Sequence, residues 1–351
     1  MHPFTIATGT MHYAQNILIK VFTYNKITGI GECSAFPMIV GETQNTCYEM
    51  AKDFAAIWKN KNVLDIEARM KELDLFTAGN STIKSAFDMA LYDIAAQYAR
   101  KPLCEYLGGS KKDMLTDITV GIATPSTMAT QAKHFVTDGA TILKVKLGKD
   151  ALTDIARIKA IREAIPDNIK IRIDANQGWS FEESKIALTQ LAAYNIEFCE
   201  QPMRTYNDEY LPELMATTPI KIMADESVYN HHDALRLIKN NACHYINIKL
   251  AKSGGIHEAL KIIEVATQNN IPCMMGGMLE SRLALTAFAH FAAANPQIIF
   301  YDMDTCMLGH KLDPVQGGVT FKGYTVQLPN AVGIGANVQV GFLNTCQQIV
   351  V

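Results

Sequence analysis

The sequence lacks several features that would each point to a particular class of protein. It has no run of basic residues, and 32 lysines and arginines nearly balance 35 acids, so the electrostatic footprint of a nucleic-acid-binding protein is missing. It has no apolar run of about 18 residues and no basic segment followed by an apolar one, so we expect neither a membrane span nor a secretory signal. Its eight cysteines show no CxxC spacing, which favours reduced packing residues in a cytoplasmic protein.

The length of the chain suits one barrel domain with a smaller domain beside it. The chain has 351 residues, whereas a barrel runs to about 250 residues as one domain. Hydrophobic residues make up 48% and charged residues 19%, with a net charge of −3, which is typical of a folded globular protein.

Residues 1–112 are predicted to form an α+β capping domain. Alternating apolar residues over 12–33, interrupted near Asn25, predict a β-hairpin. Apolar residues three and four apart predict helices over 43–58 and 81–98. The stretch GVTFKGYTVQL alternates again, so we expect residues 318–351 to return to this domain.

From Leu115 onward, short apolar runs alternate with helical segments. The runs lie about 25 residues apart, an interval typical of strand–helix units. They centre on Ile118, Leu143, Ile171, Ile196, Ile222, Ile246, Cys273 and Ile299. Eight such units predict a β/α barrel over residues 113–317, with crossover helices such as those over 154–164 and 257–267. No clear outer helix follows the last run.

Five of these runs end in a charged side chain, at the strand end where parallel-barrel enzymes carry their chemistry. In chain order the charged residues are Lys144 and Lys146, Asp174, Glu200, Asp225 and Lys249. Because side chains alternate along a strand, Lys144 and Lys146 point the same way. Each ammonium is expected to lower the pKa of the other toward the range of a usable base.

Asp174, Glu200 and Asp225 end three neighbouring strands. Carboxylates that converge in this way repel one another unless a cation lies among them, and all-oxygen ligation favours Mg²⁺ over zinc or copper. No histidine is present at these strand ends. The three acids are therefore predicted to bind Mg²⁺.

Lys146 and Lys249 end the second and sixth strands, so they lie on opposite sides of an eight-stranded barrel. A carbon acid between them, with its carboxylate on the metal, can lose a proton to one lysine and regain it from the other. Those two steps amount to racemisation or epimerisation.

The same residues lie in five motifs, and these resemble the enolase superfamily in its muconate lactonizing enzyme subgroup. The motifs are KVK, DANQGW, EQP, ADES and NIKLAKSGG. Sites of that superfamily pair a Lys or His base with Mg²⁺ and an enediolate intermediate. The resemblance implies a modified (β/α)7β barrel under a capping domain. It also implies that Lys146 and Lys249 are the acid/base pair, that Lys144 is their electrostatic partner, and that the three acids bind Mg²⁺.

Asp302 and Asp304 follow the last apolar run two residues apart, an anionic clamp suited to an ammonium group. This DxD pattern resembles that of the dipeptide epimerases of the superfamily, where it holds the substrate's α-ammonium. The implied substrate is an L-Ala-X dipeptide, inverted at its C-terminal residue. Thr8 and Met278 are further candidates for substrate binding.

The preferred second residue of the dipeptide is left open. By the same resemblance, residues 5–13 cover the second side chain, and they contain no Arg or Lys to meet a glutamate. A small or hydrophobic second residue is therefore expected as readily as glutamate, although Arg282 or Lys149 can supply a charge from the barrel loops.

Two other interpretations also stay open. The same enolate chemistry serves N-acylamino acid racemases, o-succinylbenzoate synthases and muconate cycloisomerases, and N-acylated substrates lack a free ammonium. The remote alternative is a non-catalytic barrel that binds metal or assembles with other proteins. It is remote because the sequence keeps both opposed lysines, which a scaffold does not need. Apolar surface can support a homo-oligomer, but the sequence gives no symmetry.

Overall fold

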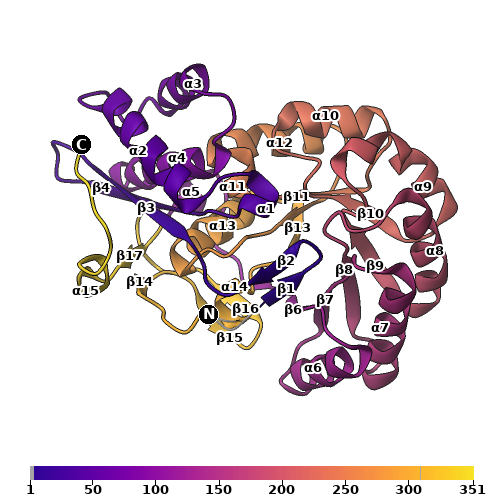
Figure 1. Cartoon of the computed structure of the whole chain (residues 1–351). Coiled ribbons are helices and arrows are strands. Elements are labelled where there is room, and N and C mark those ends of the chain that lie inside the picture. The colour runs from indigo at the N-terminus through magenta and orange to yellow at the C-terminus, as the bar shows by residue number, and fades with distance from the viewer. Residues whose placement is uncertain (1–3, 309) are drawn as a thin grey trace.

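Eight parallel strands form the centre of the molecule, and they neighbour one another in the order in which they occur in the chain (Figure 1). The computed structural model describes residues 4–308 and 310–351. The strands are β6 (Ile118–Val120), β7 (Ile142–Lys146), β8 (Lys170–Asp174), β9 (Ile196–Glu200), β10 (Lys221–Ala224), β11 (Tyr245–Ile248), β12 (Cys273–Met275) and β13 (Ile298–Tyr301). The sheet curls until its edges meet, where the Asp117 N–H donates to Tyr301 O at 3.2 Å. The predicted barrel is confirmed.

Seven of the strands lead into an outer helix. These helices are α6 (Pro125–Thr137), α7 (Ala151–Ala164), α8 (Phe181–Leu191), α9 (Leu211–Thr217), α10 (His231–Lys239), α12 (Ile256–Gln268) and α13 (Arg282–Ala294). Shorter turns are η1 (Ala192–Tyr194), η2 (Thr205–Tyr210) and α11 (Leu250–Ser253). Helix α7 begins earlier than its apolar spacing indicates, because Asp150 caps it by accepting the Thr153 N–H at 2.7 Å. As expected, β13 leads only to the four-residue α14 (Thr305–Leu308).

The N-terminal layer packs strands against helices. The predicted hairpin consists of β3 (Asn16–Phe22) and β4 (Thr28–Ser34), and the predicted helices are α2 (Gln44–Trp58) and α4 (Ser81–Tyr98). The layer also contains α1 (Pro37–Val40), α3 (Ile66–Phe76) and α5 (Leu103–Tyr106). Helix α4 lies so close to β4 that a Cβ at Gly31 would stand 1.9 Å from Ala86 O. Glycine is therefore required at that point of the strand.

A second hairpin, β1 (Phe4–Ile6) and β2 (Gly9–Met11), lies near the C-terminal ends of the barrel strands (Figure 1). Its three-residue strands are too short to give a periodic pattern, so it escapes prediction from the sequence. The Ile122 N–H, in the loop after β6, donates to Thr5 O at 3.1 Å. The hairpin is thereby joined to the barrel.

The C-terminal segment lies against both the barrel and the N-terminal layer. Strand β14 (Val315–Gly317) pairs with β17 (Ala336–Val338), while β15 (Thr320–Lys322) and β16 (Thr325–Gln327) form a sheet with β5 (Met114–Leu115). The chain ends beyond α15 (Val340–Leu343). Val315 and Val338 pack with Ile30 of β4, and the Ile334 N–H donates to the Asp93 carboxylate at 2.8 Å.

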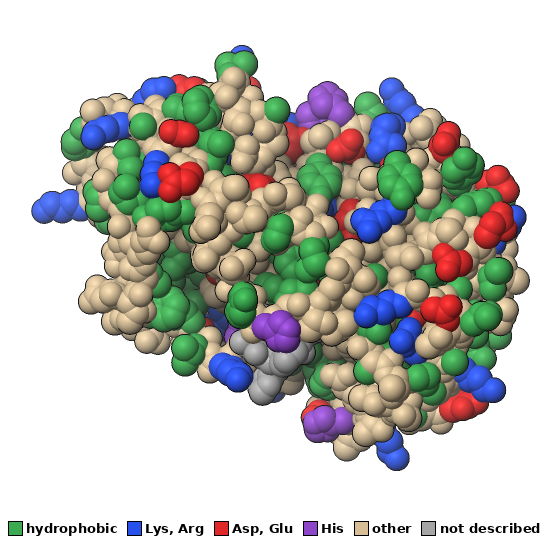
Figure 2. Space-filling model, viewed as in Figure 1, with side chains coloured by type: hydrophobic (Ala, Val, Ile, Leu, Met, Phe, Trp, Pro, Cys, Tyr) green, Lys and Arg blue, Asp and Glu red, His purple; other side chains and the backbone are tan. Residues whose placement is uncertain are grey.

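Side chains of both charge signs are mixed over the face seen in Figure 2, in line with the near balance of acids and bases. Within residues 4–308 and 310–351, no helix is long and apolar enough to cross a membrane.

Candidate active site

The charged residues of the strand ends lie together at one end of the barrel. Lys146 is the register partner of Asp174, and Asp174 is the partner of Glu200. Asp225 and Lys249 directly follow β10 and β11. Parallel strands in register bring these positions to one level, and all five side chains are buried.

Lys144 lies among three of the acids. Its Nζ is 2.7 Å from Asp302 Oδ2, 2.8 Å from Glu200 Oε2 and 3.3 Å from Asp174 Oδ2. Burial lowers the pKa of Lys144, but the three carboxylates raise it more, and the net shift is well above the ordinary value. The expectation that the pKa of Lys144 is lowered is therefore wrong, because the adjacent acids outweigh the effect of burial.

The two opposed lysines each form one short ion pair with a predicted metal ligand. Lys146 Nζ lies 2.6 Å from Asp174 Oδ2, and Lys249 Nζ lies 2.7 Å from Asp225 Oδ2. Burial lowers the pKa of Lys249, but the charges of Asp225 and then Glu200 raise it by more than burial lowers it. The net pKa of Lys249 is therefore above its ordinary value. Burial raises the pKa of Asp225, but Lys249 and a further lysine lower it well below its usual range.

That further lysine is Lys252, which strand-end reasoning misses because it lies in α11, one turn beyond Lys249. Its Nζ is 2.6 Å from Asp225 Oδ1. It also donates to the backbone carbonyls of Asp225, Val228 (3.1 Å) and Asn247 (3.2 Å). The second lysine of the NIKLAKSGG motif is the sequence signal for it, at the i+3 spacing of one helical turn.

The strand ends carry more oxygen acceptors than hydrogen-bond donors. Among the described residues, the buried oxygens here without a hydrogen bond include Glu200 Oε2, Asp225 Oδ1, Asn176 Oδ1, Glu226 Oε2 and Asn247 Oδ1. The first two make ion pairs instead, at 2.8 Å to Lys144 and 2.6 Å to Lys252. A donor set made only of oxygen atoms fits a hard divalent cation such as Mg²⁺.

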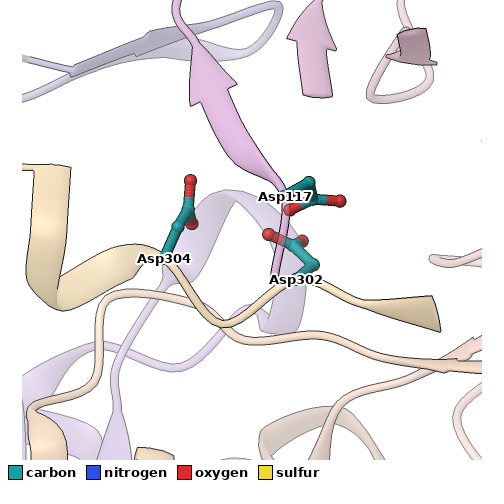
Figure 3. Close-up of side chains that lie close together, drawn as sticks. All are labelled: Asp117, Asp302 and Asp304. Carbon is teal, nitrogen blue, oxygen red and sulfur yellow. The ribbon is translucent and has the colours of Figure 1, made fainter. Parts of the chain in front are cut away.

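A second group of acids stands beside the first. Asp117, Asp302 and Asp304 each offer a carboxylate oxygen within 4.8 Å of the others (Figure 3). In the described part of the chain, they are the one set of three His, Cys, Asp or Glu side chains whose possible metal-ligand atoms lie this close together. Asp302 faces Lys144, and Asp117 Oδ2 accepts a hydrogen bond from Arg172 Nη1 at 2.8 Å. Asp117 is missed by strand-end reasoning because it precedes its strand instead of ending it.

Asp304 differs from its two neighbours because its hydrogen-bond donor is neutral. Its Oδ2 accepts the Thr119 N–H at 2.6 Å. Burial, with the added charge of Asp302, raises the pKa of Asp304 to about 7. A cationic group arriving beside Asp304 would neutralise a buried carboxylate that no ion pair satisfies among the described residues.

An apolar pocket opens above these groups. Its floor and one side carry Lys146, Lys249, Asn176, Asp302 and Asp304. Its apolar walls come from the hairpin, from α1 and its flank, and from the loop after β12, through Ile6, Met11, Phe36, Ile39, Met278 and Leu279. Most of these wall residues form one hydrophobic cluster. Met278 therefore lines this pocket, and its contact with substrate stays a prediction.

Thr8, Arg282 and Lys149 lie elsewhere. Thr8, in the turn of the hairpin, lines a second, more polar pocket together with Trp179. Arg282 is held by Asp313 at 2.5 Å and by three backbone carbonyls, and neither it nor Lys149 lines the apolar pocket. The cations that line that pocket are the two opposed lysines.

Two protein-family models match the chain. The mandelate racemase/muconate lactonizing enzyme N-terminal domain matches residues 1–108, and the enolase C-terminal domain-like model matches residues 127–340. The first match covers the N-terminal layer, and the second covers the barrel from α6 onward, without its first strand β6.

Characterised proteins of similar sequence span nearly the full chain. The D-Ala-D/L-Ala epimerase of Cytophaga hutchinsonii is 42% identical over 99% of this chain and 95% of its own length. The hydrophobic dipeptide epimerase of Enterococcus faecalis is 40% identical over 95% of this chain and 94% of its own. A crystal structure of the C. hutchinsonii dipeptide epimerase, complexed with Mg and D-Ala-L-Val, has a TM-score of 0.97 over 99% of this chain and 95% of that one, at 42% identity.

Proposed function

Because the chain belongs to the mandelate racemase/muconate lactonizing enzyme family of the enolase superfamily, we propose that it is an Mg²⁺-dependent dipeptide epimerase. It inverts the α-carbon of the C-terminal residue of a dipeptide. The observation that carries the proposal is the pairing of Lys146 and Lys249 across one pocket with the Asp302 and Asp304 clamp beside them.

The two lysines exchange a proton with the α-carbon from opposite sides. Strands β7 and β11 lie four apart in the eight-stranded sheet, so a carbon held at the pocket floor has one Nζ on each face. One lysine, as the neutral amine, removes the α-proton, and the other, as the ammonium, returns a proton to the opposite face. Asp174 and Asp225, at 2.6 and 2.7 Å from Lys146 Nζ and Lys249 Nζ, orient the two lysine side chains.

Asp174, Glu200 and Asp225 would hold the Mg²⁺ ion. When bound, the ion neutralises negative charge that develops on the substrate carboxylate. Lys144, between Glu200 and Asp302, contributes a fixed positive charge to the same region.

The substrate's α-ammonium binds at Asp304, with Asp302 beside it. Asp302 already has Lys144 as its partner, whereas Asp304 accepts only the neutral Thr119 N–H among the contacts described above. A carboxylate in the same pocket as the two lysines selects dipeptides over N-acylated amino acids, which carry no positive charge at the α-nitrogen.

We propose a small or hydrophobic second residue. The pocket walls that would face the side chain of this second residue are apolar and include Ile6, Met11 and Leu279. A glutamate side chain would be desolvated against these walls without a cation dedicated to it. The relatives named for D-Ala-D/L-Ala and for hydrophobic dipeptides are consistent with this choice.

A dipeptide library in D₂O with Mg²⁺ tests the proposal. With position one fixed as alanine, deuterium is expected at the second α-carbon. The apolar second residues are expected to exchange at least about tenfold faster than glutamate, because leaving a buried charge unpaired costs more than the roughly 1.4 kcal/mol that corresponds to a factor of ten. Mass spectrometry of the peptides and chiral separation measure exchange and inversion. Exchange with no dipeptide would refute the function, and a preference for glutamate would refute only the specificity.

Asp304→Asn is expected to lower kcat/KM for dipeptides by about a hundredfold, as expected for the loss of one partner of a buried charge pair. Because Asp304 binds the ammonium only when ionised and has a pKa of about 7, the wild-type kcat/KM is expected to rise with pH through that value. For Asp304→Asn, kcat/KM should not show this rise with pH. N-acylated amino acids serve as the control substrates, and equal sensitivity of both substrate classes to Asp304→Asn would contradict the clamp. Activity with dipeptides unaffected by the substitution would favour an N-acylamino acid racemase.

A cytoplasmic location and a homo-oligomer stay predictions. All eight cysteines are free, six of them buried, as expected for a reducing compartment. Light scattering measures the oligomeric state.

A further inference from the structure

We propose that Glu32 is a positioning residue that holds one wall of the substrate pocket in place from the N-terminal layer. The wall is the loop of residues 277–279, between β12 and α13. The inference rests on the proposed dipeptide pocket, because this wall faces the second side chain of the substrate.

Glu32 reaches from β4 to the first turn of α13. Its Oε1 accepts the Ser281 N–H at 2.9 Å and the Asn16 Nδ2 at 2.7 Å. Its Oε2 accepts the Ser281 Oγ–H at 2.7 Å and the Ala284 N–H at 3.0 Å. Two of these donors are backbone N–H groups at a helix N-terminus, which favours a carboxylate. The side chain is only 2% exposed, so Glu32 is a buried cap contributed by a different layer of the fold.

Neighbours of Glu32 fix the loop that precedes the helix. The Asn16 amide, besides contacting Glu32, donates to Leu279 O at 3.1 Å. The Leu279 N–H donates to Ser34 Oγ at 3.3 Å. Both backbone polar groups of Leu279 are therefore bound by side chains of β3 and β4.

The position of Leu279 determines the shape of the pocket. Leu279 and Met278 pack with Ile6, Met11 and Phe36 in the apolar cluster that lines it. A displacement of β4 relative to α13 moves this wall, and a shift of about 1 Å is enough to change rates about a hundredfold. Glu32 itself does not line the pocket, so it acts through Leu279.

A second buried acid of the same layer provides a matched comparison. Asp93 of α4 accepts the Ile30 N–H at 3.1 Å and the Ile334 N–H at 2.8 Å. Like Glu32, it joins the layer to a distant segment through backbone donors. Neither of its partners lines the pocket.

The test compares Glu32→Gln with Asp93→Asn in the full-length protein. Glutamine keeps the size of Glu32 but turns an NH₂ group toward donors on one side. We measure kcat/KM for Ala-Ala and Ala-Leu, amide hydrogen exchange over residues 277–284, and melting temperature. Glu32→Gln is expected to lower the Ala-Leu to Ala-Ala ratio by about tenfold, within the range for a displaced pocket wall, and to speed exchange over 277–284. Asp93→Asn is expected to lower the melting temperature without changing either.

Equal effects of the two variants on the ratio and on exchange would overturn the proposal, since both would then act through stability. If Glu32→Gln does not fold, Ser34→Ala removes only the acceptor of the Leu279 N–H and is expected to change the ratio in the same direction; an unchanged ratio there overturns the proposal. If the wild type epimerises no dipeptide, the proposed function fails, and the exchange measurement alone decides the role of Glu32.

Discussion

Lys249→Met is expected to lower epimerisation by about 10³-fold or more while proton exchange with one stereoisomer of the substrate persists. Lys146 still faces one side of the α-carbon, so it can remove and return the proton on that side. Inversion needs a proton donor or acceptor on the opposite face of the α-carbon, and the methionine side chain there can neither donate nor accept a proton. Asp225 keeps its ion pair with Lys252 at 2.6 Å, so the variant is expected to fold.

The measurement follows deuterium incorporation from D₂O separately for the two stereoisomers of one dipeptide. Lys146→Met is the matched variant and is expected to show the opposite stereochemical preference. If both variants exchange the same stereoisomer, the two lysines do not act on opposite faces. If either retains full epimerisation, its lysine is not an acid/base group.

Removal of Mg²⁺ by chelation is expected to abolish activity, by at least about 10³-fold, yet leave the protein folded. Each of the three carboxylates that would hold the ion forms an ion pair with a lysine. Asp174 pairs with Lys144 and Lys146, Glu200 with Lys144, and Asp225 with Lys249. Their repulsion is therefore neutralised by the chain itself. The loss of activity arises because no cation is left to stabilise charge on the substrate.

Circular dichroism and melting curves with and without EDTA check this prediction, and added Mg²⁺ should restore activity. Bound metal raises the melting temperature through mass action, so a modest shift is expected. Unfolding in EDTA would show that the lysines do not replace the charge of the ion. Undiminished activity in EDTA would contradict the metal requirement.

The strand-end residues are predictable from sequence because parallel strands at a constant interval share one register. Asp174 and Glu200 are paired residues of adjacent strands, and the periodic pattern contains that information. The partner of Lys144 is not predictable in the same way. Asp302 lies 158 residues further along the chain, and the two meet only because the sheet curls to bring its last strand near its second.

The pKa of Lys144 shows why that limitation matters. A KVK motif indicates two neighbouring ammonium groups and therefore a lowered pKa. The curled sheet adds Asp302, Glu200 and Asp174 around the first of them and reverses the direction of the shift. Glu32 is unpredictable for the same reason, since its partner Ser281 lies 249 residues away.

The small hairpin of β1 and β2 has a consequence for the evolution of selectivity. It supplies Ile6 and Met11 to the pocket, whereas Lys146, Lys249 and the acids stand on barrel strand ends. Substitutions in the hairpin are therefore expected to alter which side chain is accepted while leaving the strand-end residues in place. Enzymes that descend from one ancestral barrel can therefore diverge in substrate selectivity while keeping the same reaction mechanism.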